Sequence, residues 1–441
     1  MTRWRGGGML LAIKRAMEVG VSGEISQGAC LEPYRVLDVT QGGCLFCARL
    51  LGDLGADVIK IEAPGGDPSR SIGPFYKDMP DPEKSLFWLA YNANKRGVTL
   101  NLEVPDGQEI FKRLVRRAHF VIESFPPGYL DGLGLGYAQL REICPDLIVV
   151  SITPFGQSGP YARFKASDLI AWAVSGYLYV LGDPDRAPTW IPYHQATLVG
   201  GVEGAAAAMI AHYQRQSSGR GEHADVSIQE ALVNQLFTAT TFWDLNRINL
   251  SRMGDVWQIG SVVVPMTYAC RDGYVSLLML GGGSVGNVTS TRAFVSWMAE
   301  EGMAPEWLKS FDWVHEYDTM HMTQEVVDRV AAPVKEFFAT RTRQECLEAA
   351  AARSIYMAPL LDAQGVCESP HLQSRGFWEQ VEHPELGESV ALCGPYAKLS
   401  ETPLRIRRRA PLVGEHNIEV YGGELGYSRE EMVLLAEAGV I

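Results

Sequence analysis

Two adjacent cations stand beside two amide side chains in the segment YNANKRG, which contains Asn94, Lys95 and Arg96. The segment closes a loop rich in glycine, proline and charge. Ammonium and guanidinium groups bind phosphate through charge-assisted hydrogen bonds, so the segment could form a phosphate clamp. A solvated turn has the same composition, and the residue types alone do not decide between the two interpretations.

A second candidate for anion binding is the turn at Gln41, Gly42 and Gly43, which lies between an apolar run and a helical pattern. A strand, a glycine turn and a helix N-terminus together present free backbone N–H groups and the positive end of a helix dipole. Such a turn suits an anionic or phosphorylated ligand. The two glycines are not a GxGxxG fingerprint and no P-loop lysine follows, so a purely structural turn is the alternative.

Cys44 and Cys47 form a CxxC pair, while the other cysteines are scattered along the chain. No second pair supplies the spacing of a zinc site. Within a helix, such thiols are more often small core groups than redox or metal-binding groups. We therefore expect no metal site.

The elements that would position these residues follow an alternating order. Residues 36–39 and 58–61 are β-branched strands, and between them Phe46, Leu50, Leu51 and Leu54 recur at helical spacing. A helix is expected to begin at Asp106, with Glu109 at the capping-box position, and strands follow at residues 120–123 and 147–152. This order predicts an α/β fold with a mainly parallel sheet and right-handed crossovers. Small residues at 200–211 predict a closely packed helix, and residues 228–246 one long helix.

A chain of 441 residues has the length of about two domains. The composition and the breaks in the pattern predict an extension at residues 1–30, a large domain at 31–230 and a linker helix at 231–254. A smaller α+β domain at 255–350 and a return linker at 351–376 follow. Residues 377–441 then complete the large domain.

Composition also limits the kinds of partner and the cellular location that we expect. The net charge of -13 argues against a nucleic-acid partner, so a phosphorylated ligand would need a local basic cluster. The longest apolar runs fall well short of the roughly 18 residues that a membrane span needs. Arg3 and Arg5 precede only GGGMLLAI, which is too short and glycine-rich for a signal peptide. We expect a soluble, cytoplasmic protein that binds neither nucleic acid nor membrane.

Six ordered segments resemble the family III CoA-transferases of the CaiB/BaiF type: VLDVTQGGCLFCARLLGDLGADVIKIEAPGGDPSR, NANKRGVTLNL, the FPPG-x-LDGLGLGY run, SITPFGQSGPYA, SGRGEHADVS and PLVGEH. That family includes formyl-CoA, carnitine and benzylsuccinate CoA-transferases and the α-methylacyl-CoA racemases. The resemblance implies a Rossmann-like large domain in an open ring that interlocks with a second chain. It also implies a CoA thioester as substrate, an organic acid as the other substrate, and no permanently bound cofactor. By the same resemblance, Gln41, Gly42, Gly43, Asn94, Lys95 and Arg96 would lie against CoA, with Leu100, Phe125 and Lys165 as further candidates.

The resemblance also implies a nucleophile. The transferases of this family use an aspartate whose carboxylate attacks the thioester and forms a mixed anhydride, which divides the transfer into covalent steps. Counting back from the SGRG turn puts Thr197 at that position, and counting forward from Pro192 puts Ala196 there. Neither residue is a carboxylate. Threonine is a poor nucleophile without a base, although His194 lies nearby in sequence.

Asp168 is the fallback nucleophile, because the segment ASDLI carries an acid in many family members. It is not the family's nucleophile segment. In the racemases a histidine precedes this acid, and Ser167 stands there in this chain. We expect a structural hydrogen-bonding role for Asp168.

These observations favour the non-nucleophilic subunit of a heteromeric CoA-transferase, with a homologous subunit that bears the aspartate. A homodimer is the alternative assembly. Two other functions stay open, namely a self-sufficient CoA-ester lyase or isomerase and a non-catalytic CoA-binding or structural partner. The acceptor acid carries no motif.

Overall fold

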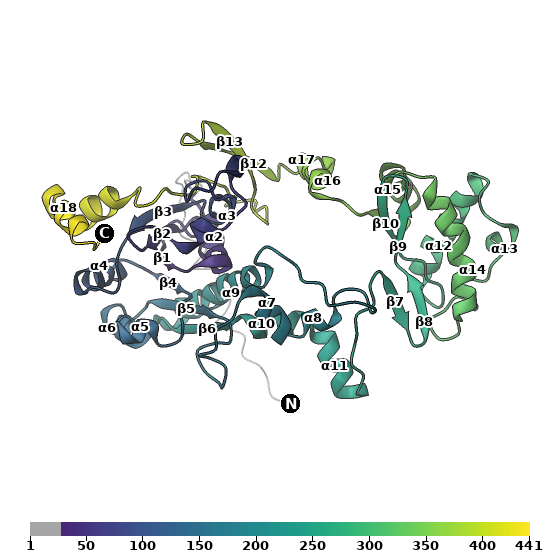
Figure 1. Cartoon of the computed structure of the whole chain (residues 1–441), viewed down its shortest axis with the longest axis horizontal. Helices are drawn as coiled ribbons and strands as arrows, with labels where there is room; N and C mark the ends of the chain where they lie inside the picture. The colour runs from purple at the N-terminus through teal and green to yellow at the C-terminus, as the bar shows by residue number, and fades with distance from the viewer. Residues whose placement is uncertain (1–27) are drawn as a thin grey trace, which may run out of the picture.

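The computed structural model describes residues 28–441, so nearly all of the expected N-terminal extension lies outside the described residues. Figure 1 shows two bodies that are joined by two separate segments of chain, so the backbone traces an open ring. One body holds a parallel sheet and both the first and the last described elements. The other body holds small antiparallel sheets and a group of helices.

Within residues 28–441 the largest sheet has six strands in the order β3-β2-β1-β4-β5-β6, all parallel. The strands are β1 (Arg35–Val39), β2 (Asp57–Glu62), β3 (Lys95–Thr99), β4 (Phe120–Glu123), β5 (Ile148–Thr153) and β6 (His223–Ser227). Every residue of β5 is buried, as expected for a strand covered on both faces. The strand order reverses between β1 and β4, and ligands of doubly wound sheets bind outside the carboxyl ends of the strands at such a point.

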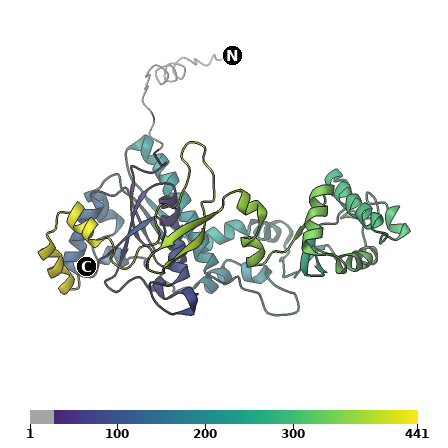
Figure 2. The same ribbon diagram turned by 90° about the horizontal axis from the view of Figure 1, so that it is seen from above.

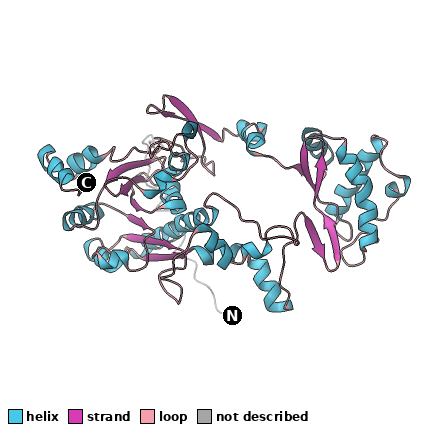
Figure 3. Ribbon diagram, viewed as in Figure 1, coloured by secondary structure: helices cyan, strands magenta, loops and turns pink. Residues whose placement is uncertain are grey.

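Helices cover both faces of this sheet, as Figure 3 shows in cyan and magenta. On one face, α2 (Leu45–Asp53), α9 (Gln195–Ser218) and α10 (Ile228–Gln235) share a core with strand residues such as Val36 and Ile122. On the other face, α4 (Pro105–Val115), α6 (Tyr137–Ile143) and the π-helix η4 (Ile418–Glu424) pack on residues such as Leu37 and Val121. Neighbouring residues of one strand thus enter opposite cores, because side chains alternate across a strand.

Two sequence predictions about helices are wrong, one about where a helix begins and one about whether a helix is continuous. The helix predicted to begin at Asp106 begins at Pro105, with Val104 at the N-cap and no side-chain cap, so the expected capping box with Glu109 is absent. Proline suits the first helical position because its ring fixes φ and its missing N–H has no helical partner there. The helix predicted over residues 228–246 divides into α10 and α11 (Phe237–Asn246), with a break at Leu236.

The second body has its own core. The strands are β7 (Val256–Ile259), β8 (Val262–Pro265), β9 (Thr267–Cys270), β10 (Gly273–Leu277) and β11 (Met357–Pro359), and the helices are α12 (Val285–Glu300), α13 (Glu306–Lys309), α14 (Gln324–Ala339) and α15 (Arg343–Arg353). Phe294, Trp297 and Phe337 contact one another at its centre, with ring centroids 4.6–6.1 Å apart. Seen from above in Figure 2, this body lies apart from the parallel sheet.

The chain then returns to the parallel sheet through α16 (Ala363–Cys367), α17 (Pro370–Ser374) and the hairpin β12 (Trp378–His383) and β13 (Glu388–Cys393). The helix α18 (Arg429–Glu437) follows η4 near the C-terminus. Short elements complete the fold, namely η1 (Gly42–Cys44), η2 (Pro68–Ser71), η3 (Tyr76–Asp78), α3 (Leu86–Tyr91), α5 (Tyr129–Gly132), α7 (Asp168–Val174) and α8 (Tyr177–Val180). Among residues 28–441, no helix is both long and apolar enough to cross a membrane.

Candidate functional site

Thr197 and Ala196, the two residues counted to the nucleophile position, lie in the first turn of α9. Ala196 is fully buried in the core on that face of the sheet. The Thr197 hydroxyl donates to the carbonyl oxygen of His194 at 2.9 Å. Its Oγ1 also lies 3.4 Å from Asp168 Oδ1. The structure therefore places an alanine methyl group and a hydrogen-bonded hydroxyl at this position, and neither is a carboxylate.

Asp168 binds the N-terminus of α9 from the first position of α7. Its Oδ1 accepts from the Thr197 amide at 3.0 Å, and its Oδ2 accepts from Trp190 Nε1 at 3.4 Å. The residue is 8% exposed. A carboxylate at a helix N-terminus satisfies an orphan amide and interacts favourably with the helix dipole. This geometry gives Asp168 a hydrogen-bonding task in the fold.

His194 does not serve as a base for Thr197 in this arrangement. It occupies the N-cap position of α9 with a φ of 60°, and the preceding Tyr193 has a φ of 67°. Thr197 contacts the His194 carbonyl group, whereas the imidazole lies against Phe87, with ring centroids 5.1 Å apart. These rings, together with Tyr91 and Trp190, line a largely apolar pocket of about 540 Å³ beside the α9 N-terminus.

The turn at Gln41, Gly42 and Gly43 is tied to its surroundings through its backbone. The Gln41 amide donates to Ser124 Oγ at 2.9 Å, and the Gly42 amide donates to Ser69 Oγ at 2.7 Å. A side chain at Gly43 would overlap Thr197 Oγ1, so the glycine allows η1 and α9 to approach closely. Two of the amides that could have bound an anion are thus occupied by hydroxyl groups. The geometry favours the structural turn.

Lys95 is the first residue of β3 and is fully buried. Its Nζ donates to Asp38 Oδ2 at 2.7 Å, to the carbonyl oxygen of Leu45 at 2.8 Å and to Asn92 Oδ1 at 2.9 Å. Burial would raise the pKa of Asp38, but Lys95 and Lys60 hold it below its ordinary value. All three N–H groups of the ammonium are used within the fold, and this geometry argues against the predicted phosphate clamp.

Arg96 and Asn94 also bind other parts of the chain. Both Asp57 oxygens accept from Arg96, Oδ1 from Nε at 2.9 Å and Oδ2 from Nη2 at 2.7 Å, and Arg96 Nη1 donates to Glu419 and Glu424. Asn94, with a φ of 63°, donates to Asp53 and accepts from the Arg407 amide at 2.6 Å. Asn94 and Arg96 therefore connect residues 407–424 to the parallel sheet. The segment NKR forms neither a solvated turn nor an open cluster of cations.

Three of the residues expected near CoA do line one pocket. Gln41, Leu100 and Phe125 lie at the carboxyl ends of β1, β3 and β4, around a pocket of about 410 Å³. We call it the carboxyl-edge pocket; Ile61, Asn101, Glu103 and Tyr129 are also among its lining residues. It lies where the strand order reverses, which is the usual ligand position in doubly wound sheets. Lys165 lies elsewhere, exposed on the loop between β5 and α7.

The CxxC thiols point into the core. Cys44 and Cys47 are both buried, and burial raises the pKa of the Cys44 thiol to about 12. A thiol with such a pKa stays protonated at neutral pH and is a poor nucleophile and metal ligand. Among residues 28–441, no group of three or more His, Cys, Asp or Glu side chains is arranged to hold a metal ion.

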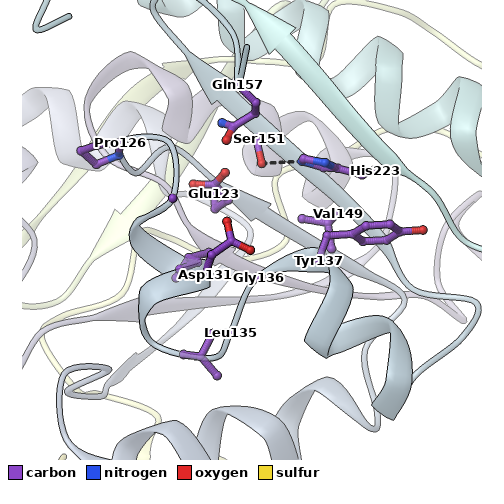
Figure 4. Close-up of a pocket in the computed structure, with 12 residues that line it drawn as sticks. Glu123, Pro126, Asp131, Leu135, Gly136, Tyr137, Val149, Ser151, Gln157 and His223 are labelled. Carbon is purple, nitrogen blue, oxygen red and sulfur yellow. Dashed lines mark hydrogen bonds between the residues drawn. The ribbon is translucent and has the colours of Figure 1, made fainter. Parts of the chain in front are cut away.

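A cluster of polar residues that the sequence analysis missed lies on the other face of the sheet from α9. Glu123, Ser151 and His223 come from the adjacent strands β4, β5 and β6 and surround a small cavity of about 30 Å³, shown in Figure 4. The sequence signals it only by polar residues within three predicted strands, which do not by themselves form a motif. Strand register brings them together, since Glu123 pairs with Ser151 and Val149 pairs with His223.

The six-stranded order, the two covered faces and the pocket at the switch point define a Rossmann-like α/β protein. A sequence profile for CoA-transferase family III matches residues 31–417. The chain belongs to CoA-transferase family III, as the six motifs predicted.

Relatives and a solved structure agree with this assignment. The chain is 34% identical to the succinyl-CoA:(R)-benzylsuccinate CoA-transferase subunit BbsE of Thauera aromatica, over 92% of this chain and 97% of the relative. It is 33% identical to a formyl-CoA:oxalate CoA-transferase of Streptomyces coelicolor, over 93% and 99%. It is 31% identical to the succinyl-CoA–L-malate CoA-transferase beta subunit of Chloroflexus aurantiacus, over 93% and 98%. A CAIB/BAIF family protein from Brucella suis superposes with a TM-score of 0.73 at 26% identity, over 90% and 99%.

Proposed function

We propose that this chain is the non-nucleophilic subunit of a heteromeric CoA-transferase, which moves CoA between an acyl-CoA donor such as succinyl-CoA and an organic carboxylate. The observation that carries the proposal is the first turn of α9, where Ala196 is buried and the Thr197 hydroxyl donates to a backbone carbonyl. A homologous subunit would supply the aspartate. Relatives named as subunits, BbsE and the L-malate transferase beta subunit, support a heteromeric assembly.

The chemistry explains why the missing carboxylate matters. A carboxylate oxygen attacks the thioester carbonyl carbon, the C–S bond breaks, and CoA leaves as a thiolate while the acyl group forms a mixed anhydride. The thiolate can then attack the enzyme-side carbonyl carbon of the anhydride, so that the donor carboxylate leaves and CoA is held as an enzyme thioester. The acceptor carboxylate attacks this thioester to form a second anhydride, and the thiolate takes the acceptor acyl group while the enzyme carboxylate leaves. Thr197 has an alcohol of high pKa, and within residues 28–441 the acid hydrogen-bonded to its hydroxyl is Asp168, which already accepts from the Thr197 amide. A threonyl ester would also release CoA without an anhydride to accept it again.

The carboxyl-edge pocket is the proposed site for the nucleotide part of CoA. Phe125 and Tyr129 are stacked there, with ring centroids 4.7 Å apart, and they offer an aromatic wall to a purine ring. Leu100 adds an apolar surface and Gln41 an exposed amide. Lys165 remains a proposed phosphate contact from its exposed loop, in place of the buried Lys95 and Arg96.

The helix α11 supports a second chain as partner. None of its residues is buried, although it is rich in large apolar side chains, and Phe237 is 69%, Trp243 48% and Leu245 74% exposed. Monomeric proteins rarely leave so much apolar area on one element uncovered, because its burial is favourable. Figure 1 shows that the backbone traces an open ring, the arrangement expected for two chains that interlock. We propose that a homologous subunit binds there and that the complex acts in the cytoplasm. The domain boundaries of the sequence analysis are proposed as well, except that the smaller domain continues past residue 350 to β11, which pairs with β10.

The test is an exchange assay on the purified chain, alone and co-purified with an aspartate-bearing homologue. Succinyl-CoA consumption is followed by chromatography against a panel of organic acids that includes benzylsuccinate, oxalate and malate. We expect no exchange by the chain alone and robust exchange by the complex.

Two variants make the result specific. Thr197→Val removes the hydroxyl from this chain and should leave the activity of the complex intact, whereas replacement of the partner's aspartate by asparagine should abolish it. Exchange by the chain alone that Thr197→Val or Asp168→Asn eliminates would contradict the proposal. Conversion of an acyl-CoA without any acceptor acid would instead support a lyase or isomerase.

A further inference from the structure

The residues Glu123, Ser151 and His223, here called the Glu123 cluster, form a connected polar group that the proposed transfer chemistry does not use. Ser151 Oγ lies 2.8 Å from His223 Nε2, and the Ser151 hydroxyl lies close enough to the Glu123 carboxyl group to lower its pKa. Figure 4 shows the carboxyl and hydroxyl groups turned toward the same small cavity. Its volume of about 30 Å³ is enough for a water molecule but not for an acyl group.

One further group is aimed at this space. Gln157 lines the cavity, and its buried Nε2 has no hydrogen-bond partner within residues 28–441. Buried polar groups in folded proteins are nearly always paired with protein or with ordered water. The cavity thus has the size and the donor for one bound water next to Glu123. The cavity is too small to be a second active site.

Glu123 connects the cluster to the carboxyl-edge pocket through the backbone. Its Oε2 accepts from the Phe125 amide at 2.7 Å, so the carboxyl group fixes the turn that follows β4. The Phe125 ring is stacked on Tyr129, and the Tyr129 hydroxyl donates to Glu103 Oε1 at 3.1 Å. Phe125, Tyr129 and Glu103 all line the pocket. Glu123 itself is only 5% exposed and does not line it.

We propose that Glu123 is a positioning residue whose proton sets how firmly the Phe125–Tyr129 wall is held, so that CoA binding in the carboxyl-edge pocket releases a proton. The site of CoA rests on the function proposed above. An ionised carboxylate accepts a hydrogen bond about twice as strongly as a neutral carboxyl group. The wall is therefore held more firmly when Glu123 is ionised. A ligand that stacks on the ordered Phe125 and Tyr129 rings therefore binds the ionised form of Glu123 more tightly. Its binding releases the Glu123 proton.

The surroundings of Glu123 bring its titration into the neutral range. Burial raises its pKa to about 7, the Ser151 and Phe125 hydrogen bonds oppose this rise, and the charges of Asp131 and Asp225 add to it. The groups that face the cluster from the packed elements are Asp131 on α5, Tyr137 on α6, Asp225 and His223 on β6, and the Cys44 thiol on η1. No cation among them pairs with the Glu123 carboxyl group within the described residues.

The hydrogen bonds of the cluster can follow the proton. When Glu123 is ionised, the Ser151 hydroxyl donates to it, and His223 Nε2 donates to Ser151. When Glu123 is protonated, it can donate to Ser151, which then donates to an unprotonated Nε2. The exposed His223 exchanges its other proton with solvent. Both states leave Ser151 with a donor and an acceptor, so its hydroxyl stays hydrogen-bonded in either state.

The first test is isothermal titration of the purified chain with CoA at pH 6 and pH 8, in buffers with different ionisation enthalpies. An ionised Glu123 accepts the hydrogen bond from the Phe125 amide more strongly than a neutral Glu123 does. The difference predicts that CoA binds roughly fivefold more tightly at pH 8 than at pH 6. Proton release near pH 7 should be larger for the wild-type chain than for Glu123→Gln, in which only the pH dependence due to CoA's own phosphate should remain. Comparison with the variant removes the contribution of CoA's own phosphate. Asp131→Asn is the matched control, and it should keep proton release but shift its midpoint to lower pH.

A second measurement does not depend on CoA. Hydrogen exchange of the Phe125 amide in the ligand-free chain, corrected for the intrinsic effect of pH, should show less protection at pH 6 than at pH 8 in the wild type only. If protection changes in this way but CoA does not bind, the proposed CoA site is wrong and the positioning role stands. If CoA binds with the same proton release and pH dependence in Glu123→Gln as in the wild type, or if protection of the amide is independent of pH, the inference is wrong.

Discussion

Replacement of Lys95 by methionine should destabilise the protein by about 3–5 kcal/mol, because it removes one partner of a buried ion pair. Methionine fills much of the same volume but leaves Asp38 fully buried without its ammonium partner. The carbonyl oxygen of Leu45 and Asn92 Oδ1 also lose a donor. Thr40 still donates to Asp38 through its amide and its hydroxyl, at 2.9 and 2.6 Å, and Lys60 still lowers its pKa. We therefore expect a value near the lower end of the range.

The assay is urea unfolding at pH 7, with the CoA affinity of the folded protein measured in parallel. Lys335→Met is the matched control, since Lys335 is exposed on α14, away from the proposed CoA site, and its replacement should change stability by less than about 0.5 kcal/mol. The double variant Asp38→Asn/Lys95→Met should be less destabilised than the sum of the single variants, because neither charge is then left unpaired. A Lys95→Met protein with wild-type stability and lost CoA affinity would refute this reasoning and restore the phosphate clamp.

Three further variants test other contacts. The folded pKa of Glu123 is raised, so the wild type loses stability as Glu123 ionises between about pH 4.5 and above pH 7. Glu123→Gln lacks this loss, and in thermal or urea unfolding it should become more stable relative to the wild type by about 3 kcal/mol over that range. A constant difference across pH would contradict it. Gly43→Ala should cost about 1–3 kcal/mol through overlap with Thr197, and Thr197→Ala in the same chain should recover part of the loss; unchanged stability of the single variant would show that η1 and α9 are not packed closely. Asp168→Asn keeps an acceptor for the Thr197 amide and should retain substantial exchange activity in the complex, and a complete loss of activity in a folded variant would make its carboxylate catalytic.

Local patterns in the sequence predicted much of the sheet. The β-branched runs at 36–39 and 58–61 lie in β1 and β2, as predicted. Phe46, Leu50 and Leu51, which recur at helical spacing, lie in α2 between these strands. The small residues at 200–211 lie within α9, where Gly201 and Gly204 approach η1 and α2. These features depend on periodicity and residue size, both of which act over a few residues.

The candidate site was harder to predict because its contacts span hundreds of residues. The composition around Lys95 and Arg96 predicts a loop, but β3 begins at Lys95 and both side chains are buried in the fold. Arg96 is paired with Glu419 and Glu424, more than 300 positions away, and no local pattern announces such partners. Glu123, Ser151 and His223 meet only through strand register. The position of Thr197 came from counting along a resemblance, and the structure adds that its hydroxyl is bonded to His194.

The proposal that this chain lacks the nucleophile is tested most directly by trapping the covalent intermediate in the assembled complex. The complex is incubated with succinyl-CoA and hydroxylamine, which converts an activated enzyme carboxyl group into a stable hydroxamate, and both subunits are digested and mapped by mass spectrometry. We expect the label on an aspartate of the homologous subunit and none on this chain. A label on Asp168, or an acyl group retained on Thr197, would contradict the account and make this chain the catalytic one.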